Sequence, residues 1–130
     1  MPKVKTSELQ GTALDWAVSV AGEYEAGGHR PRLGWSTRTD VPHYWCVRHQ
    51  VKDVGWFADY EFCPSRDWSQ GGPIIGRGGI SWHCGNKTIW HAYAYGSSTN
   101  YNGPTPLIAA MRCYVASKLG DEVEIPESLC

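Results

Sequence analysis

The segment from Asp67 to Ile80 carries the side chains best suited to chemistry in this chain. It combines an acid, an aromatic ring, an amide and flanking arginines with several glycines. Glycine lets backbone N–H groups approach a ligand closely, a tryptophan face can stack on a base, and arginine pairs with anions. Because such segments are typical of recognition loops, we expect a loop that contacts a small anionic, nucleotide-like ligand. The binding residues predicted there are Arg66, Asp67, Trp68, Gln70, Gly71 and Gly72.

These residues also have structural alternatives. The glycines could form an anion-binding nest or a tight turn with positive φ, and their spacing matches neither the phosphate-loop motif nor the dinucleotide-binding motif. Trp68 could stack on a base or anchor the core. Gln70 could recognise a base edge or satisfy loop backbone. Asp67 could accept hydrogen bonds from a ribose or cap a turn, and we favour the cap.

The sequence contains no complete catalytic signature. His91 is the best candidate for a general base because strand alternation places it beside Tyr93, although a lone strand histidine is more often structural. Ser69 lacks the nucleophile-elbow motif. Zinc needs four ligands in tetrahedral reach, usually in tight pairs. His43 and Cys46 are three apart and His83 is adjacent to Cys84, but no Cys-x-x-Cys is present and neighbouring strand residues point to opposite faces. We therefore expect no catalytic residues, no metal and no cofactor.

Composition limits the classes of partner. The 130 residues are 42% hydrophobic and 19% charged, which indicates one globular domain over residues 1–130. A net charge of −1 argues against general affinity for nucleic acid or membranes, although a small basic cluster is formed by Arg30, Arg32 and Arg38. The N-terminus has no export signal, so we expect the five cysteines to be free thiols in a reducing cytoplasm.

The aromatic content is high. Seven tryptophans and seven tyrosines exceed what so small a core can readily bury, and each buried one needs a partner for its polar atom. We therefore expect some of them to line a concave surface or the interface of a homo-oligomer.

Helices are predicted near both ends of the chain. Ser7 and Gln10 have capping-box spacing, apolar residues recur at helical steps over 13–21, and Gly22 is expected to end this helix. A second helix is predicted from Pro106 to Leu119, with Thr105 as its cap and Gly120 as its end.

Strands are predicted between these helices. Aromatic and β-branched runs indicate strands over 43–47, 55–58 and 60–63, with short strands over 73–75 and 79–82 and a hairpin turn over 85–87.

The strand predicted over 88–95 is the clearest of them. Alternation places Trp90 and two alanines on one face, suited to packing a helix, and His91 and Tyr93 on the other. The second face could be exposed, line a pocket or contact another subunit, and we take Trp90, His91 and Tyr93 as predicted pocket walls. The expected fold is α+β: an antiparallel sheet with the N-terminal and C-terminal helices packed on it.

Three segments carry a resemblance to a known family: residues 4–9 with 13–18, residues 67–75, and residues 103–123. In them the chain resembles the NinX-like proteins of lambda-type bacteriophages, while residues 22–63 and 76–101 match loosely and Arg66 replaces a smaller residue. The resemblance implies a small phage accessory protein made in the host bacterial cytoplasm. Shorter motifs, at 14–17, 34–35 and 67–68, resemble small phage counter-defence proteins, which sequester nucleotide immune signals in oligomer pockets.

These observations lead to one expected function and two alternatives. We expect a non-enzymatic phage protein that binds a small nucleotide-like ligand, such as a host immune signal, as a homo-oligomer. The first alternative is a protein–protein adaptor that docks on a host factor. The second is a nucleotide-processing enzyme with His91 as its base.

Overall fold

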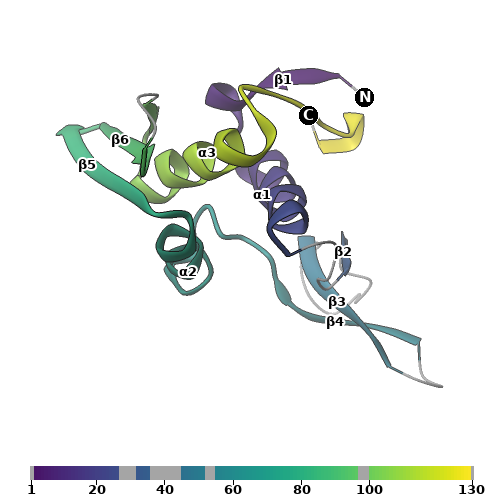
Figure 1. The fold of residues 1–130 in the computed structure, drawn as a ribbon. Coiled ribbons are helices and arrows are strands. Elements are labelled where there is room, and N and C mark those ends of the chain that lie inside the picture. Colours follow the sequence, from purple (N-terminus) through teal and green to yellow (C-terminus); the bar gives the residue numbers. More distant parts are fainter. Residues whose placement is uncertain (1, 27–31, 36–44, 52–54, 97–99, 130) are drawn as a thin grey trace.

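The computed structural model describes residues 2–26, 32–35, 45–51, 55–96 and 100–129. In chain order the elements are β1 (Lys3–Lys5), the 3-10 turn η1 (Thr6–Glu8), α1 (Gly11–Ala26), β2 (Arg32–Trp35), β3 (Trp45–Val51), β4 (Gly55–Glu61), α2 (Trp68–Gly78), β5 (Ile80–Asn86), β6 (Ile89–Ala94), β7 (Tyr101–Gly103), α3 (Pro106–Leu119), β8 (Glu122–Glu124) and the 3-10 turn η2 (Glu127–Leu129). The predicted α+β class is confirmed (Figure 1).

The described strands form three small antiparallel sheets. Strand β1 pairs with β8, strands β2, β3 and β4 form a second sheet in that order, and β5, β6 and β7 form the third. The pairing of β1 with β8 brings the two ends of the chain side by side (Figure 1). The antiparallel pairing was predicted, but the strands were expected in one sheet. None of the helices in the described ranges has the length and apolar character needed to span a membrane.

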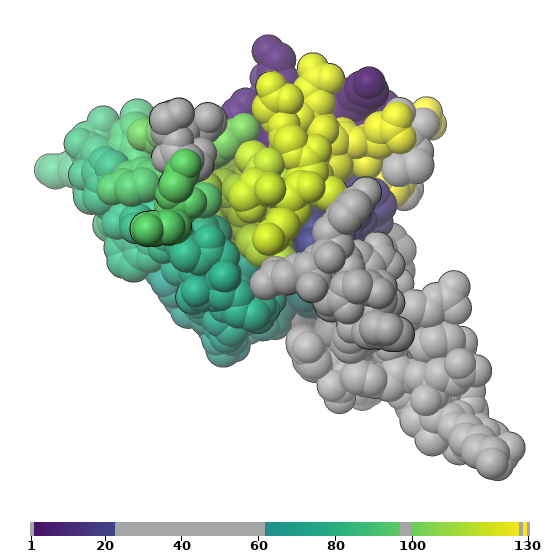
Figure 2. Space-filling view, viewed as in Figure 1, coloured from purple at the N-terminus to yellow at the C-terminus, as the bar shows by residue number. Residues whose placement is uncertain are grey.

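Helix α3 lies at the centre of the core. It packs on the β5–β6–β7 sheet and also contacts α1 and α2. Figure 1 shows it between that sheet and α1. The small-residue face of β6 receives it as predicted, because Ala92 is fully buried. Strand β7 and α3 approach each other closely at Gly103, because a Cβ there would lie 2.9 Å from Cγ2 of Ile108. In Figure 2 the C-terminal segment, in yellow, fills the space between the green strands and the purple N-terminal segment.

The ends of α3 confirm the prediction for this helix. The Oγ1 of Thr105 accepts a hydrogen bond from the backbone N–H of Ile108 at 3.1 Å, and Pro106 occupies the first turn. Gly120 follows the helix with φ +94°, a conformation that glycine adopts without strain.

The prediction for α1 is only partly right. Ser7 lies in η1 and not at the cap of a longer helix, and α1 begins at Gly11. The helix also continues through Gly22 to Ala26. Packing on α3 explains this continuation, because Gly22 faces the hydroxyl of Tyr114 across the interface between the helices. Tertiary contacts of this kind override the weak helix propensity of glycine.

The glycine-rich segment is a helix and not the expected loop. Helix α2 spans Trp68–Gly78 with Pro73 inside it, so the strand predicted over 73–75 is wrong. The Asp67 carboxylate caps the helix by accepting from the N–H of Ser69 at 2.9 Å, and Gly79 ends it with φ +60°. These end signals and the packing of Ile74 into the core outweigh the glycines within the helix.

The remaining strand predictions are close to the structure. The runs over 55–58 and 60–63 merge into the single strand β4, and the run over 43–47 corresponds to β3, although residues 43 and 44 lie outside the described residues. The strand over 79–82 becomes the longer β5. The expected hairpin turn joins β5 to β6, where the Asn86 side chain accepts from the N–H of Thr88 at 2.9 Å.

Candidate functional site

Three tryptophans form a continuous aromatic cluster at the surface, and we call it the tryptophan cluster: Trp68, Trp82 and Trp90. Trp68 is the first residue of α2, and the other two lie on one face of the β5–β6 hairpin. The ring centroids of Trp68 and Trp82 are 5.7 Å apart at 56° between the planes, and those of Trp82 and Trp90 are 5.8 Å apart at 66°.

Two of these rings are open to solvent. Trp68 is 49% exposed and Trp82 is 41% exposed, whereas Trp90 packs partly against the core. Tilted and edge-to-face contacts of this kind are favourable aromatic geometries. They hold the two exposed rings in place and leave apolar surface on which a flat ligand can stack, a contact worth about 1–3 kcal/mol per base.

The polar residues before α2 bond to one another and to nearby backbone. The Asp67 carboxylate accepts from the Ser69 hydroxyl at 2.7 Å as well as from its N–H, and from Nε2 of Gln70 at 3.1 Å. The hydrogen bonds from Ser69 hold the pKa of the Asp67 carboxyl below its ordinary value. The Oε1 of Gln70 accepts from the N–H of Cys63 at 2.9 Å. Asp67 therefore has the favoured capping role, and Gln70 satisfies backbone.

A cavity of about 530 Å³ lies along another side of α2, and we call it the α2 cavity. Helix geometry separates it from the tryptophan cluster, because residues two apart on a helix point in different directions and Trp68 and Gln70 are two apart. Arg77 supplies a cationic group to this cavity. Its lining comprises Phe62, Asp67, Ser69, Gln70, Ile74 and Arg77.

The other predicted residues of the segment serve different purposes. Gly71 is buried, and a Cβ there would lie 2.6 Å from the carbonyl oxygen of Pro64 and 2.5 Å from Cδ2 of Leu107. At Gly72 a Cβ would meet no atom within 4 Å. Both glycines are helical residues without positive φ. Arg66 is exposed in the turn just before α2.

His91 and Tyr93 lie on the opposite face of β6 from Trp90. The imidazole of His91 stacks on that of His83, with ring centroids 5.3 Å apart, and His83 also contacts Tyr93. The Nδ1 of His91 is 3.2 Å from Oδ1 of Asn100. The structure therefore divides the nine predicted residues among the tryptophan cluster, the α2 segment and this outer sheet face.

Trp82 was missed as a site residue, although its neighbours were predicted as a strand. Alternation along β5 places Trp82 in phase with the buried Ile80. Pairing β5 with β6 then brings Trp82 beside Trp90, which a hairpin prediction with the correct register would have shown. Among the residues that the structure describes, no three His, Cys, Asp or Glu side chains are grouped to hold a metal ion.

Comparison with known proteins identifies the family. The family model described as "Bacteriophage P22, NinX" matches residues 5–118, so it includes α1, α2, all but the last residue of α3 and all three residues of the tryptophan cluster. A search of curated proteins found no match. The match confirms the resemblance to NinX-like phage proteins found in the sequence, and the chain belongs to the bacteriophage P22 NinX family.

Proposed function

We propose that this phage protein binds a small, nucleotide-like ligand on the tryptophan cluster and retains it unaltered. The observation that carries the proposal is the pair of exposed rings, Trp68 and Trp82, held in contact at 5.7 Å. Every base has a π-face, so stacking on tryptophan tolerates different bases. A core anchor would be buried, and these two rings are not.

One charged side chain near the cluster, that of Arg66, suits an anionic ligand, because the neighbouring Asp67 carboxylate is engaged by Ser69 and Gln70 as a helix cap. Arg66 is exposed and stands two residues before Trp68, so a guanidinium lies close in the chain to the stacking surface. Guanidinium groups pair with phosphate oxygens through two parallel hydrogen bonds. The ligand would then place its base on the tryptophans and its phosphate at Arg66.

The chemistry of the cluster favours binding over catalysis. Indole rings neither accept nor donate protons in acid–base catalysis, and the nearby Asp67 carboxylate is held by Ser69 and Gln70 as a helix cap.

A protein that binds its ligand without altering it acts by lowering the free concentration of that ligand. We propose that it does so in the host bacterial cytoplasm as a homo-oligomer, and that a host immune nucleotide is the ligand, which would make the protein a counter-defence factor.

A thermal-shift screen tests this proposal with ATP, cyclic dinucleotides and ADP-ribose as probes. We expect at least one probe to raise the Tm of the wild-type protein, and Trp68→Ala and Trp82→Ala to remove that rise. Tyr93→Ala is the matched control, because Tyr93 is 40% exposed on the opposite face of the hairpin. Stabilisation by none of the probes contradicts the proposal, and a loss caused only by Tyr93→Ala places the site on the outer face.

A release experiment separates binding from catalysis. A probe that stabilises the protein is incubated with it and recovered by heat denaturation, and its mass is measured. Recovery of the intact probe is expected for a sequestering protein. A changed mass would support the nucleotide-processing alternative with His91 as base.

A second candidate function is an adaptor that docks on a host protein. It is favoured by the distribution of large exposed apolar side chains, which among the described residues are Trp68, Trp82, Ile89, Tyr93 and Tyr95. All of them belong to α2, the β5–β6 hairpin or the residue after it. Strand β5 is also an edge strand of its sheet, and such edges can pair with another chain. Tyr93→Ala distinguishes this case when the binding of a host protein is measured. A broad docking surface would include both faces of the hairpin, so the substitution should weaken docking although it leaves nucleotide binding unchanged.

A further inference from the structure

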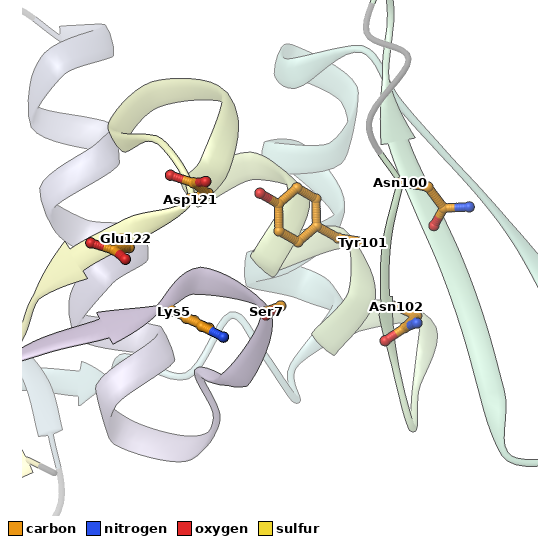
Figure 3. Close-up of a pocket in the computed structure, with 7 residues that line it drawn as sticks. All are labelled: Lys5, Ser7, Asn100, Tyr101, Asn102, Asp121 and Glu122. Atoms are coloured by element: carbon orange, nitrogen blue, oxygen red, sulfur yellow. The ribbon is translucent and has the colours of Figure 1, made fainter.

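A second cavity lies where the two ends of the chain meet strand β7, and we call it the terminal cavity. Its volume is about 310 Å³, within the range of small-molecule sites. Figure 3 shows its side chains: Lys5 and Ser7 come from the β1–η1 segment, Asn100, Tyr101 and Asn102 from β7 and the residue before it, and Asp121 from the junction of α3 with β8. This cavity belongs neither to the tryptophan cluster nor to α2.

Buried hydrogen bonds hold the walls of the terminal cavity together. The Arg112 guanidinium is 8% exposed and donates from Nε to the carbonyl of Leu9 at 2.7 Å and from Nη1 to the carbonyl of Asn102 at 2.8 Å. These bonds tie β7 to the segment that follows η1. Both bonds end on backbone carbonyls, so they hold the main chain of the two walls in place whether or not a ligand is present. A wall that is already ordered reduces the entropic cost of binding.

The opposite wall is fixed in the same way. Thr6 is fully buried and donates from Oγ1 to the carbonyl of Gly120 at 2.8 Å. Its N–H donates to the carbonyl of Asp121 at 2.8 Å. The Asp121 backbone is therefore anchored at the wall of the cavity.

The lining side chains can both donate and accept hydrogen bonds. The hydroxyls of Ser7 and Tyr101 do both, and the carboxylate of Asp121 accepts. Asn102 is paired with His91, so alternation turns its amide to the outer face of the sheet. The Oδ1 of Asn100 lies 3.2 Å from Nδ1 of His91 on that same face. In Figure 3 the hydroxyl end of Tyr101 is directed toward the side on which Asp121 lies. Burial, and next the charge of Asp121, raise the pKa of Tyr101, so its phenol stays protonated at neutral pH and keeps its donor.

The charges of the cavity argue against an anionic ligand. Lys5 contributes one positive charge, and Asp121 and Glu122 contribute two negative charges. Lys5 is also directly opposite Glu122 in the β1–β8 pair, and opposite charges at such positions attract. The remaining carboxylate, that of Asp121, is an acceptor suited to hydroxyl groups. The cavity is thus polar, with a net acidic balance, and contains an aromatic side chain.

We propose that the terminal cavity binds a neutral ligand that presents several hydroxyl groups, as a sugar unit does. The Asp121 carboxylate can accept from neighbouring hydroxyls of one ligand while the Ser7 and Tyr101 hydroxyls donate to them or accept from them, and Tyr101 adds an aromatic surface for its C–H groups. The free monosaccharide and the sugar of a larger glycan share this chemistry. The proposal is independent of the tryptophan cluster and stands if no nucleotide binds there.

An NMR titration tests the proposal on the full chain. Ribose, glucose and N-acetylglucosamine are added separately into the millimolar range, and an oligosaccharide of the best monosaccharide is added next to distinguish a free sugar from a glycan. We expect saturable shifts of the backbone amide signals of Ser7, Tyr101 and Asp121 with at least one sugar. Inorganic phosphate should leave these signals unchanged.

Variants assign the effect to the cavity. Asp121→Asn and Tyr101→Phe should weaken sugar binding by about tenfold or more, because the first removes the charged acceptor and the second removes a hydroxyl that bonds the ligand. Glu124→Gln is the matched control, since Glu124 is exposed on β8 outside the lining, and it should leave binding unchanged. The absence of saturable shifts with all the sugars, or equal weakening by Glu124→Gln and Asp121→Asn, would overturn the proposal.

Discussion

Two neighbouring glycines of α2 should respond differently to the same substitution. At Gly71 an alanine Cβ meets the Pro64 carbonyl oxygen at 2.6 Å and Cδ2 of Leu107 at 2.5 Å, and the first of these atoms is backbone that cannot rotate away. At Gly72 the added methyl group meets no atom of another element, and its one steric conflict is with the ring of Pro73, the next residue of the helix. The pair therefore separates close packing between elements from backbone preference within a single turn of helix.

The magnitudes follow from these contacts. Overpacking typically costs about 1–3 kcal/mol, and two contacts this short place Gly71→Ala near the upper end. The gain in helix propensity from glycine to alanine, about 1 kcal/mol, offsets part of this cost, so we expect a net loss of about 2 kcal/mol. Gly72→Ala gains the same propensity, but its Cβ conflicts with the ring of Pro73, which disfavours helical backbone at the preceding residue. We therefore expect its free energy of unfolding to stay within about 0.5 kcal/mol of the wild-type value.

Urea denaturation followed by circular dichroism measures both changes by linear extrapolation. The midpoint should fall clearly for Gly71→Ala and stay close to that of the wild type for Gly72→Ala, with the m-value unchanged. A midpoint for Gly71→Ala at or above that of the wild type would refute the close packing of α2 on Leu107 and Pro64. An equally large loss from both substitutions would refute the helix itself, because a loop with positive φ at these glycines would penalise alanine at each position.

Three further predictions concern single side chains. Arg112→Lys should cost about 1.5–3 kcal/mol in urea denaturation, because an ammonium cannot replace both donors of the buried guanidinium; an unchanged midpoint would contradict the hydrogen bonds to Leu9 and Asn102. Burial raises the pKa of Cys113 to about 11, so at pH 8 iodoacetamide should label the exposed Cys84 well before Cys113, as peptide mass spectrometry can show; the reverse order would contradict the burial of Cys113. The pKa of Asp67 is lowered on folding, so its stabilising effect is complete above the ordinary value of 3.8 and is lost as the pH falls through the folded pKa; the difference in Tm between wild type and Asp67→Asn should therefore shrink in this acid range, and a constant difference would contradict the cap.

The parts of the fold that were predicted correctly have strong local signals. Helix α3 has a side-chain cap at Thr105, a proline in its first turn and a glycine after its end, so its boundaries follow from chemistry within a few residues of each end. Strand β6 shows regular alternation that matches one buried and one exposed face. In both elements the local preference and the tertiary environment agree.

Helix α2 was predicted wrongly because its local and tertiary signals conflict. Four glycines and a proline within Trp68–Gly78 all disfavour a helix interior, and they indicated a loop. Gly71 is there because only glycine fits between α2, Pro64 and Leu107, and this contact spans distant parts of the sequence. Sequence patterns within one segment carry no information about such a contact.

The candidate site was also predicted only in part, because contacts between distant segments assemble it. Trp68 and Trp90 were chosen from the sequence, and the structure connects them through Trp82. Their separation from His91 and Tyr93 follows from strand alternation, which had already placed Trp90 on the other face of the strand. What could not be predicted was which face meets α2, because that depends on how the hairpin packs against α3 and α2.

The most direct test of the proposed function is an NMR titration that follows the indole N–H signals of the seven tryptophans. The probe is a nucleotide that stabilises the protein in the thermal-shift screen, and single Trp→Ala variants assign the signals. We expect saturable shifts of Trp68, Trp82 and Trp90, with no change at Trp16, a residue of α1 that packs against the core. Saturable shifts at Trp16 with none in the tryptophan cluster, or no shift at all, would contradict the account.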